Sequence, residues 1–260
     1  MAASSTTARP PVPVQGKIIL VTGANRGIGK AFVETFLEQG AAKVYAGVRN
    51  LESVKFFEGN ERVIPLCMDM SKPETIQEAV KQSSDVDIVI NNAGQLINVK
   101  PMDEGAIGTL EQLMNVNVYG LMHMANSYLP ILKSKATPTA FVQINSVASF
   151  RCGLPGVSAY SASKAAAYSI TQALRQVSPD VRIISVHPGP IRTDMIGNAS
   201  EELAKMAEPP SQVAMEVIAA LESPTEVFHV FPDSKSKNLH NVLKDYTKIV
   251  IEDGNGYGIE

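Results

Sequence analysis

The stretch Lys17–Gly29 reads K-I-I-L-V-T-G-A-N-R-G-I-G. Its first six residues form an apolar run suited to a buried parallel strand. Apolar residues then recur at helical spacing over Ile28–Gln39, so a glycine-rich turn joins a strand to a helix. Such a turn lets the backbone approach a pyrophosphate, and the helix N-terminus offers free N–H groups and a positive dipole. We predict a dinucleotide site here; the alternative is an ordinary glycine turn.

Strand and helix patterns alternate along the rest of the chain. The strand-like runs are Lys17–Thr22, Lys43–Val48, Val63–Met68, Val86–Ile90, Ala140–Asn145, Val181–Val186 and Val227–Phe231. The helical patterns are Ile28–Gln39, Glu74–Gln82, Leu110–Leu132, Ala159–Val177 and Gln212–Leu221. This alternation predicts an α/β fold: a doubly wound (Rossmann-type), mostly parallel sheet of about seven strands with helices on both faces. Residues 16–250 are expected to form a single dinucleotide-binding and catalytic domain.

A tyrosine and a lysine stand four residues apart in S-A-Y-S-A-S-K, as Tyr160 and Lys164. On a helix this spacing places both on one face. A neighbouring cation favours the phenolate, so we expect Lys164 to lower the pKa of Tyr160 and make it a usable proton donor and acceptor. The alternative is a half-buried tyrosine beside a solvated lysine.

Several motifs stand in series at the predicted carboxyl ends of the strands. They are T-G-A-N-R-G-I-G at Thr22–Gly29, Asp69 after the third strand, N-N-A-G at Asn91–Gly94, Asn117 in N-V-Y-G, Ser146, Tyr160 with Lys164, and P-G-P-I-R-T at Pro188–Thr193. In these motifs, from about Lys17 to Phe231, the chain resembles the single-domain short-chain dehydrogenases/reductases. The resemblance implies an NAD(P)-dependent oxidoreductase.

The resemblance implies a catalytic tetrad of Asn117, Ser146, Tyr160 and Lys164. Tyr160 would be the proton donor in carbonyl reduction, and Lys164 would also bind the nicotinamide ribose. Ser146 would hold the substrate oxygen, and the backbone carbonyl of Asn117 would hold a water in a proton relay.

Each of two tetrad positions has a competitor nearby. Ser149 competes with Ser146, whose hydroxyl could instead cap a strand end. Asn115 competes with Asn117, although only Asn117 has the N-x-x-G spacing. His187 is interpreted as a strand-end histidine without a catalytic role.

The resemblance also implies a set of cofactor contacts at the carboxyl ends of the strands. These are Gly23, Asn25, Arg26, Gly27, Ile28, Gly29, Arg49, Asp69, Met70, Asn92, Ala93, Gly94, Tyr160, Lys164, Pro188, Gly189, Ile191 and Thr193. Asp69 would bind the adenine, or alternatively cap a helix. The loop Pro188–Thr193 would hold the nicotinamide.

The predicted preference for NAD(H) or NADP(H) depends on the residues at the end of the second strand. An acidic residue there binds the free ribose hydroxyls of NAD and repels a 2′-phosphate. Val48 stands at that place, followed by Arg49, and Arg26 lies in the glycine-rich turn. Two arginines suit a phosphate, so we predict NADP(H) over NAD(H). The alternative is two solvated surface arginines.

The substrate pocket is predicted to be largely apolar. Its expected walls are Gln95–Ile97, Phe150–Leu154 and Met195–Ile196, with Arg151 and Cys152 as the polar exceptions. We predict NADPH-dependent reduction of a small to medium ketone or aldehyde. The alternatives are an NADP-dependent alcohol dehydrogenase acting in the oxidative direction and a non-catalytic nucleotide-responsive binding protein. The segment Asp194–Pro210 is too short for a large lid.

Composition limits the classes of partner that we expect for the protein. The net charge of −3 without a basic block argues against nucleic acid, and no apolar run reaches the length of a bilayer span. Neither Cys67 nor Cys152 lies in a metal-ligand or C-x-x-C pattern, so we expect no metal, no disulfide and a cytoplasmic protein. Cys67 is expected in the core.

The ends of the chain and its assembly complete the predictions. Residues 1–15 are small, polar and proline-rich, which indicates a disordered arm; the alternative is an organelle-targeting peptide. Residues 251–260 are expected to fray. The polar tail after Phe231 departs from the short ending of tetrameric family members. A homodimer through Leu110–Leu132 and Ala159–Val177 is therefore expected, a tetramer less so.

Overall fold

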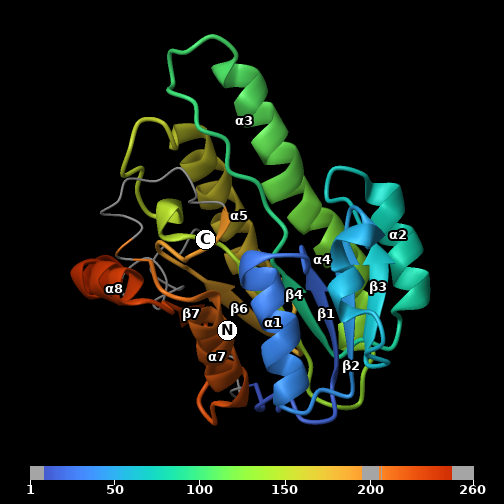
Figure 1. The fold of residues 1–260 in the computed structure, drawn as a ribbon. Coiled ribbons are helices and arrows are strands. Elements are labelled where there is room, and N and C mark those ends of the chain that lie inside the picture. Colours follow the sequence, from blue (N-terminus) through green and yellow to red (C-terminus); the bar gives the residue numbers. More distant parts are fainter. Residues whose placement is uncertain (1–8, 195–204, 206, 248–260) are drawn as a thin grey trace.

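A seven-stranded parallel sheet forms the centre of the molecule, as a computed structural model covering residues 9–194, 205 and 207–247 describes it (Figure 1). The strands are β1 (Ile18–Thr22), β2 (Lys43–Val48), β3 (Val63–Cys67), β4 (Ile88–Asn91), β5 (Ala140–Ile144), β6 (Arg182–Val186) and β7 (His229–Val230). Their order is β3-β2-β1-β4-β5-β6-β7, and every neighbouring pair is parallel. The predicted doubly wound sheet is confirmed.

Helices cover both faces of this sheet (Figure 1). The α-helices are α1 (Gly27–Glu38), α2 (Pro73–Gln82), α3 (Ala106–Met114), α4 (Gly120–Lys133), α5 (Ser158–Val177), α7 (Pro210–Glu222) and α8 (Ser234–Thr247). Short 3₁₀ or π turns are η1 (Leu51–Phe57), η2 (Asn115–Tyr119) and η3 (Val147–Ser149). Helices α1 and α7 pack on one face, and α2, α4 and α5 on the other.

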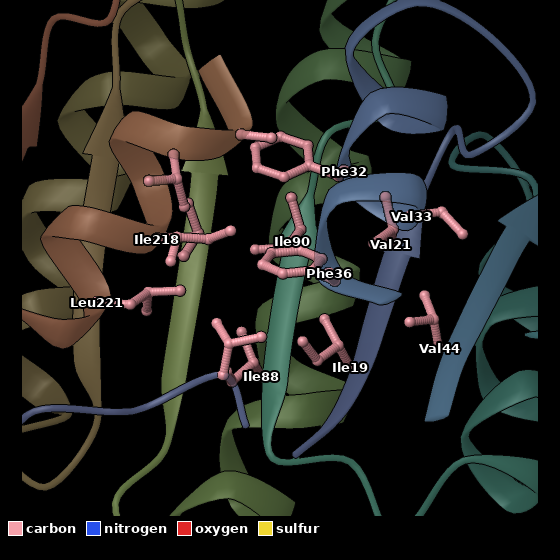
Figure 2. Packing of buried hydrophobic residues seen from close by; sticks show 14 of the residues in the cluster. Ile19, Val21, Phe32, Val33, Phe36, Val44, Ile88, Ile90, Ile218 and Leu221 are labelled. Carbon is pink, nitrogen blue, oxygen red and sulfur yellow. The ribbon is translucent and has the colours of Figure 1, made fainter. Parts of the chain in front are cut away.

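The two apolar faces of the sheet arise because successive side chains of the central strands point to opposite faces. Ile19 and Val21 of β1 point toward α1, where Phe32 and Phe36 pack against them (Figure 2). Leu20, which lies between Ile19 and Val21 in β1, belongs to the hydrophobic cluster on the opposite face. Side chains alternate across a strand, so an all-apolar strand such as β1 is buried on both sides, as a parallel sheet requires.

The strand order reverses beside β1, which pairs with β2 on one side and with β4 on the other. Crossovers from these strands leave to opposite faces of the sheet, so a crevice opens at the carboxyl ends of β1 and β4. Ligands of doubly wound folds bind at such a switch point. The glycine-rich turn and the N-N-A-G motif both begin there.

The helical stretch expected over Leu110–Leu132 is not one α-helix. A π turn, η2, separates α3 from α4 and contains Asn117. Gly120 follows this turn, and an added Cβ there would lie 2.7 Å from the Cβ of Met70. The helix thus approaches the backbone after β3 closely, and π turns often mark functional sites.

The expectation of a disordered arm over residues 1–15 is wrong for residues 9–15. Val12 and Val14 are fully buried beside α7, and the Val12 amide donates to Leu221 O at 2.8 Å. The Arg9 guanidinium binds Glu226 and donates to Pro179 O at 2.7 Å. Two buried valines and a paired arginine outweigh the entropy of a proline-rich segment. Residues 1–8 lie outside the described part.

Two further expectations need correction at the sheet edges. The polar tail forms α8, whose first turn is capped by Asp233 and Ser236. Cys67 is exposed rather than in the core, because β3 is an edge strand with several side chains facing outward. Residues 251–260 lie outside the described part. None of the helices in the ranges described is long and apolar enough to cross a membrane.

Candidate active site

Two adjoining cavities lie at the carboxyl ends of the strands. The larger has a volume of about 720 Å³ and follows the glycine-rich turn; the smaller, of about 100 Å³, lies between α5 and the loop after β6. Ile28, Asn92, Gly94 and Thr193 line both, so the cavities form one cleft. All predicted site residues line this cleft except Gly29 and Asn117.

The glycine-rich turn has the tight geometry that its sequence predicts. Gly23 and Gly27 have φ of 67° and 52°, in the left-handed region that favours glycine. Gly29 is in the first turn of α1, where an added Cβ would lie 2.0 Å from Gly23 O. A side chain at Gly29 would therefore force the helix N-terminus away from the turn.

The N-N-A-G segment is fastened to the end of β1 by Thr22. The Thr22 Oγ1 accepts hydrogen bonds from the Asn92 and Ala93 amides, at 3.0 and 2.9 Å. Asn92 Nδ2 donates back to Thr22 O at 2.9 Å. These bonds hold the ends of β1 and β4 at a fixed separation, which shapes the floor of the larger cavity.

Asp69 and two arginines lie around the larger cavity. Asp69 Oδ1 accepts from the Ser71 amide and hydroxyl, at 2.9 and 2.7 Å. Burial acts to raise the pKa of Asp69, but these bonds and the charges of Arg49 and Lys72 outweigh it and lower the pKa. Asp69 closes the turn before α2 without capping the helix, since Lys72 is at the N-cap. Adenine binding remains a prediction.

Arg26 and Arg49 are exposed on the rim of the same cavity, and Val48 lines its wall. Arg26 Nη1 pairs with Asp194 at 3.3 Å, but both side chains are about two-thirds exposed. Such a pair contributes little to stability. The Arg26 guanidinium is therefore available to another anion.

Tyr160, Ser146 and Lys164 converge on the smaller cavity. Burial raises the pKa of Tyr160, opposed by the Ser146 hydroxyl, which lowers it. Lys164 Nζ lies 5.8 Å from the Tyr160 ring centre and donates to Ile144 O at 2.8 Å. Burial lowers the pKa of Lys164 to about 8. The expected lowering of the Tyr160 pKa by Lys164 is therefore not found, because burial dominates.

Ser146 also has the capping role that was its alternative. Its Oγ accepts from the Ala148 amide at 3.1 Å at the start of η3, and approaches Pro188 O at 3.5 Å. Ser149 lines neither cavity, whereas Ser146 lines the smaller one beside Tyr160. The geometry favours Ser146 over Ser149.

Asn117 is buried behind the cleft, next to Gly94. Its Nδ2 donates to Ser163 Oγ at 2.9 Å and to Gln95 O at 3.0 Å, and its Oδ1 accepts from the Gln95 amide at 2.9 Å. Because the side chain is fully engaged, it joins α5 to the loop after β4. Asn115 lines the larger cavity instead.

The loop after β6 closes the smaller cavity. Pro188 O accepts from the Val147 amide at 3.0 Å, and the Gly189 amide donates to the Asp233 carboxylate at 2.6 Å. Ile191 is buried and pairs in a β-bridge with Glu208. Thr193 approaches the glycine-rich turn so closely that an added Cβ on Gly27 would lie 2.9 Å from its Cγ2.

The predicted substrate walls are only partly realised. Leu96 and Ile97 pack near Tyr160, as expected. Phe150 instead packs inward against Tyr168 and His187, while residues 151–154 are exposed. Met195 and Ile196 lie outside the described residues.

His187 is a buried strand-end histidine, as interpreted. Its Nδ1 lies 3.4 Å from Ser146 O and its Nε2 3.3 Å from His229 Nδ1. Burial lowers its pKa to about 3, so the ring is neutral at physiological pH. The neutral ring supports the backbone of Ser146 rather than exchanging protons.

Three residues that contribute to the site were not predicted as site residues: Thr22, Ser163 and Asp233. Thr22 begins the motif Thr22–Gly29, so its position was a usable signal. Ser163 and Asp233 act through contacts between segments that are distant in the chain, and no local sequence pattern predicts such contacts.

Comparison with known proteins agrees with this geometry. The family model for short chain dehydrogenases matches residues 17–204. An uncharacterised oxidoreductase of Staphylococcus saprophyticus is 30% identical over 227 residues, covering 83% of this chain and 95% of that protein.

Two solved structures are also similar. A short chain dehydrogenase from Burkholderia cenocepacia, in complex with NADP, is 31% identical with a TM-score of 0.81, covering 92% of this chain and 97% of that one. An alcohol dehydrogenase from Thermococcus sibiricus, complexed with 5-hydroxy-NADP, is 25% identical with a TM-score of 0.73, covering 84% and 96%. The chain belongs to the short-chain dehydrogenase family, and it is an oxidoreductase of that family.

Proposed function

We propose that the protein reduces a ketone or aldehyde to an alcohol with NADPH, and that Tyr160 donates the proton. The observation that carries this proposal is that Ser146, Tyr160 and Lys164 line one small cavity, which opens into the cleft along the glycine-rich turn. A carbonyl in the small cavity would lie near a hydroxyl, a phenol and a cation at once.

The raised pKa of Tyr160 suits proton donation. Burial disfavours the phenolate, so the side chain is a neutral phenol at neutral pH and carries the proton that an alkoxide needs. The Ser146 hydroxyl lines the same cavity, where it would stabilise the negative charge that develops on the carbonyl oxygen. Lys164 is buried near the phenol and, as a cation, would stabilise the tyrosinate left after transfer.

The residues present fit a dinucleotide. The glycine-rich turn keeps side chains away from the start of α1, and the volume of the larger cavity lies in the range of ligand sites. Asp69, Met70 and Asn92–Gly94 would hold the adenosine side, and Pro188–Thr193 the nicotinamide. When bound, NADPH supplies the hydride that reduces the carbonyl carbon.

A preference for NADPH over NADH is supported by the charges around the larger cavity. Arg26 and Arg49 are exposed on its rim, and the apolar Val48 takes the place where an acidic side chain would repel a 2′-phosphate. A hydrogen bond to a charged group contributes about 1.5–3 kcal/mol. The NADP in the Burkholderia cenocepacia structure supports the same choice.

The substrate we propose is a small to medium, largely apolar carbonyl compound. Leu96 and Ile97 pack beside Tyr160, and the exposed Leu154 extends the apolar character of the loop after β5. Arg151 is exposed and lines neither cavity, so it does not call for an anionic substrate.

The direct test is NADPH oxidation with a panel of aldehydes, ketones and quinones, using the native protein and Tyr160→Phe. We expect turnover with some members of the panel and a loss of about 10²–10⁴-fold in kcat for the variant, with NADPH binding retained. Turnover that survives Tyr160→Phe unchanged would contradict the assignment. Tight NADPH binding without any turnover would favour the alternative of a nucleotide-responsive binding protein.

The oxidative direction is a second candidate, because the same residues serve both. As the alcohol dehydrogenase of Thermococcus sibiricus is a structural neighbour, oxidation of alcohols with NADP should be assayed in parallel. A neutral, buried Tyr160 favours reduction near neutral pH, since oxidation requires the phenolate.

We further propose a homodimer that buries the outer faces of α4 and α5. Tyr119, the last residue of η2, and Met122 of α4 are exposed, and the exposed Ala162 and Ala165 of α5 allow close approach. Sedimentation at micromolar concentration should give a dimer, and Met122→Lys should weaken it. A monomeric native protein would contradict this assembly.

A further inference from the structure

A buried carboxylate joins the C-terminal helix to the loop that closes the small cavity. Asp233 is 2% exposed, and its Oδ2 accepts a hydrogen bond from the Gly189 amide at 2.6 Å. The two residues come from segments that follow different strands, β7 and β6. Charge-assisted bonds of this length are among the stronger ones in proteins.

The Asp233 carboxylate cannot move freely, because its other oxygen is held by the start of α8. Oδ1 accepts from the Ser236 amide at 2.9 Å, and the Ser236 hydroxyl donates to Asp233 O at 2.9 Å. Both residues are buried at the first turn of α8. The two carboxylate oxygens thus serve different segments, one the helix cap and the other the loop.

Gly189 is shaped to receive this carboxylate. A Cβ added there would lie 2.6 Å from Asp233 Oδ1, so the carboxylate packs directly against the glycine backbone. Pro188 and Gly189 both line the small cavity with Tyr160. A shift of the loop would therefore change the wall opposite the reacting side chains.

A second acidic residue, Glu208, also connects the loop Pro188–Thr193 to the start of α8. The Arg192 amide donates to Glu208 O at 2.9 Å, and Glu208 Oε1 accepts from the Ser234 amide at 2.8 Å. Glu208 therefore joins the far end of the loop to the start of α8. The loop Pro188–Thr193 is held at two points by one helix terminus.

We infer that Asp233 is a positioning residue that fixes Gly189, and through it the loop Pro188–Thr193, against the nicotinamide end of the coenzyme. The inference rests on the proposed function, because that loop matters to coenzyme only if one binds in the cleft. It assigns a role in the site to α8, which begins next to Asp233.

The test compares binding of NADPH with binding of 2′,5′-ADP, which carries the adenosine half and the 2′-phosphate but no nicotinamide. Asp233→Asn keeps the size of the side chain but turns one acceptor into a donor. We expect it to weaken NADPH binding about tenfold while 2′,5′-ADP binding stays within about twofold. NADPH fluorescence and calorimetry measure these affinities without turnover.

Ser236→Ala is the matched control, since it loosens the cap of α8 but leaves the carboxylate facing Gly189. It should lower the melting temperature and leave the ratio of the two affinities unchanged. If Ser236→Ala weakens NADPH as much as Asp233→Asn does, or if Asp233→Asn affects both ligands equally, Asp233 is only a helix cap and the inference fails.

Gly189→Ala provides an independent variant should Asp233→Asn fold poorly. Its added Cβ would displace the carboxylate in the native background, and Asp233→Ala removes the three atoms nearest to that Cβ, so the two substitutions should be non-additive in NADPH affinity. Strict additivity overturns the inference. Native protein that binds neither NADPH nor NADH overturns the proposed function itself, and the inference with it.

Discussion

The side-chain amide of Asn117 donates a hydrogen bond to Ser163 Oγ at 2.9 Å, one residue before Lys164. Ser163 Oγ donates in turn to Tyr160 O at 2.8 Å. The π turn that holds Asn117 is thus connected to the helical turn that carries both the phenol and the ammonium.

Ser163→Ala should therefore reduce activity without changing the side chains of Tyr160 and Lys164. Removing the hydroxyl leaves one Asn117 N–H without its acceptor and should cost about 1–3 kcal/mol in the free energy of unfolding. We expect kcat to fall more than NADPH affinity, because the helix turn shifts rather than the cofactor contacts. Urea unfolding and steady-state kinetics measure both effects.

Ser161→Ala is the matched control for that substitution. Ser161 is buried on the same helix, and its Oγ finds no hydrogen-bond partner among the described residues. Its removal should leave stability and kcat near native values. Equal losses for both variants would show that any small change on α5 has the effect.

Arg49→Ala should weaken NADPH binding and leave NADH binding nearly unchanged. Arg49 is exposed on the rim of the larger cavity, and a lost charge-assisted bond to the 2′-phosphate corresponds to about a 10- to 100-fold loss. NADH serves as the internal control, since it has no such phosphate. Equal affinity of the native protein for both coenzymes would refute the preference.

Lys164→Met should change how stability depends on pH. The pKa of Lys164 is lowered from 10.5 to about 8 in the fold, so between these values the unfolded chain holds a proton that the folded one has released. Stability of the native protein should rise through this window relative to the variant, by about 2–3 kcal/mol between pH 7 and pH 10. Urea unfolding of both proteins at the two pH values measures it, and parallel profiles would contradict the shift.

Arg182→Lys should destabilise the protein by about 3 kcal/mol or more. Arg182 is 1% exposed, and its guanidinium donates to the carbonyls of Ala220, Leu221, Ser223, Thr225 and Arg9. A lysine ammonium has three donors and no planar fork, so several carbonyls at the end of α7 would lose their partner. Thermal or urea unfolding measures the loss.

Arg62→Lys is the control for this prediction. Arg62 also donates to carbonyls near the end of a helix, those of Leu37 and Ala41, but is itself exposed. Water can replace its bonds, so the same exchange should cost less than about 1 kcal/mol. Similar losses at both positions would show that burial of Arg182 is unimportant.

The sequence predicted what depends on local pattern. Strands and helices can be predicted from the spacing of their apolar residues along the chain. The glycine-rich turn can be predicted from the spacing of its glycines between a strand and a helix. Ser146 was expected just after a strand, and Tyr160 and Lys164 on one face of a helix. In the fold, the end of β5 and the start of α5 bring all three residues to one cavity.

What the sequence did not predict depends on contacts between distant segments. The spacing of Tyr160 and Lys164 indicated one helix face, but not that the lysine would donate to Ile144 O or that burial would dominate the tyrosine pKa. The helix α8 was not predicted from the polar tail; its first turn is held by Asp233, which contacts Gly189 far away in the chain. Packing of the N-terminal residues likewise depends on α7.

The attachment of residues 9–14 has a consequence for how the chain completes its fold during synthesis. Arg9 and Val12 precede every strand of the sheet in the chain and are therefore synthesised before it, yet their partners are Arg182, Leu221 and Glu226. The N-terminal segment must therefore wait, unpaired, until nearly the whole domain has been translated. Contacts between segments so far apart in the chain form late and slow folding.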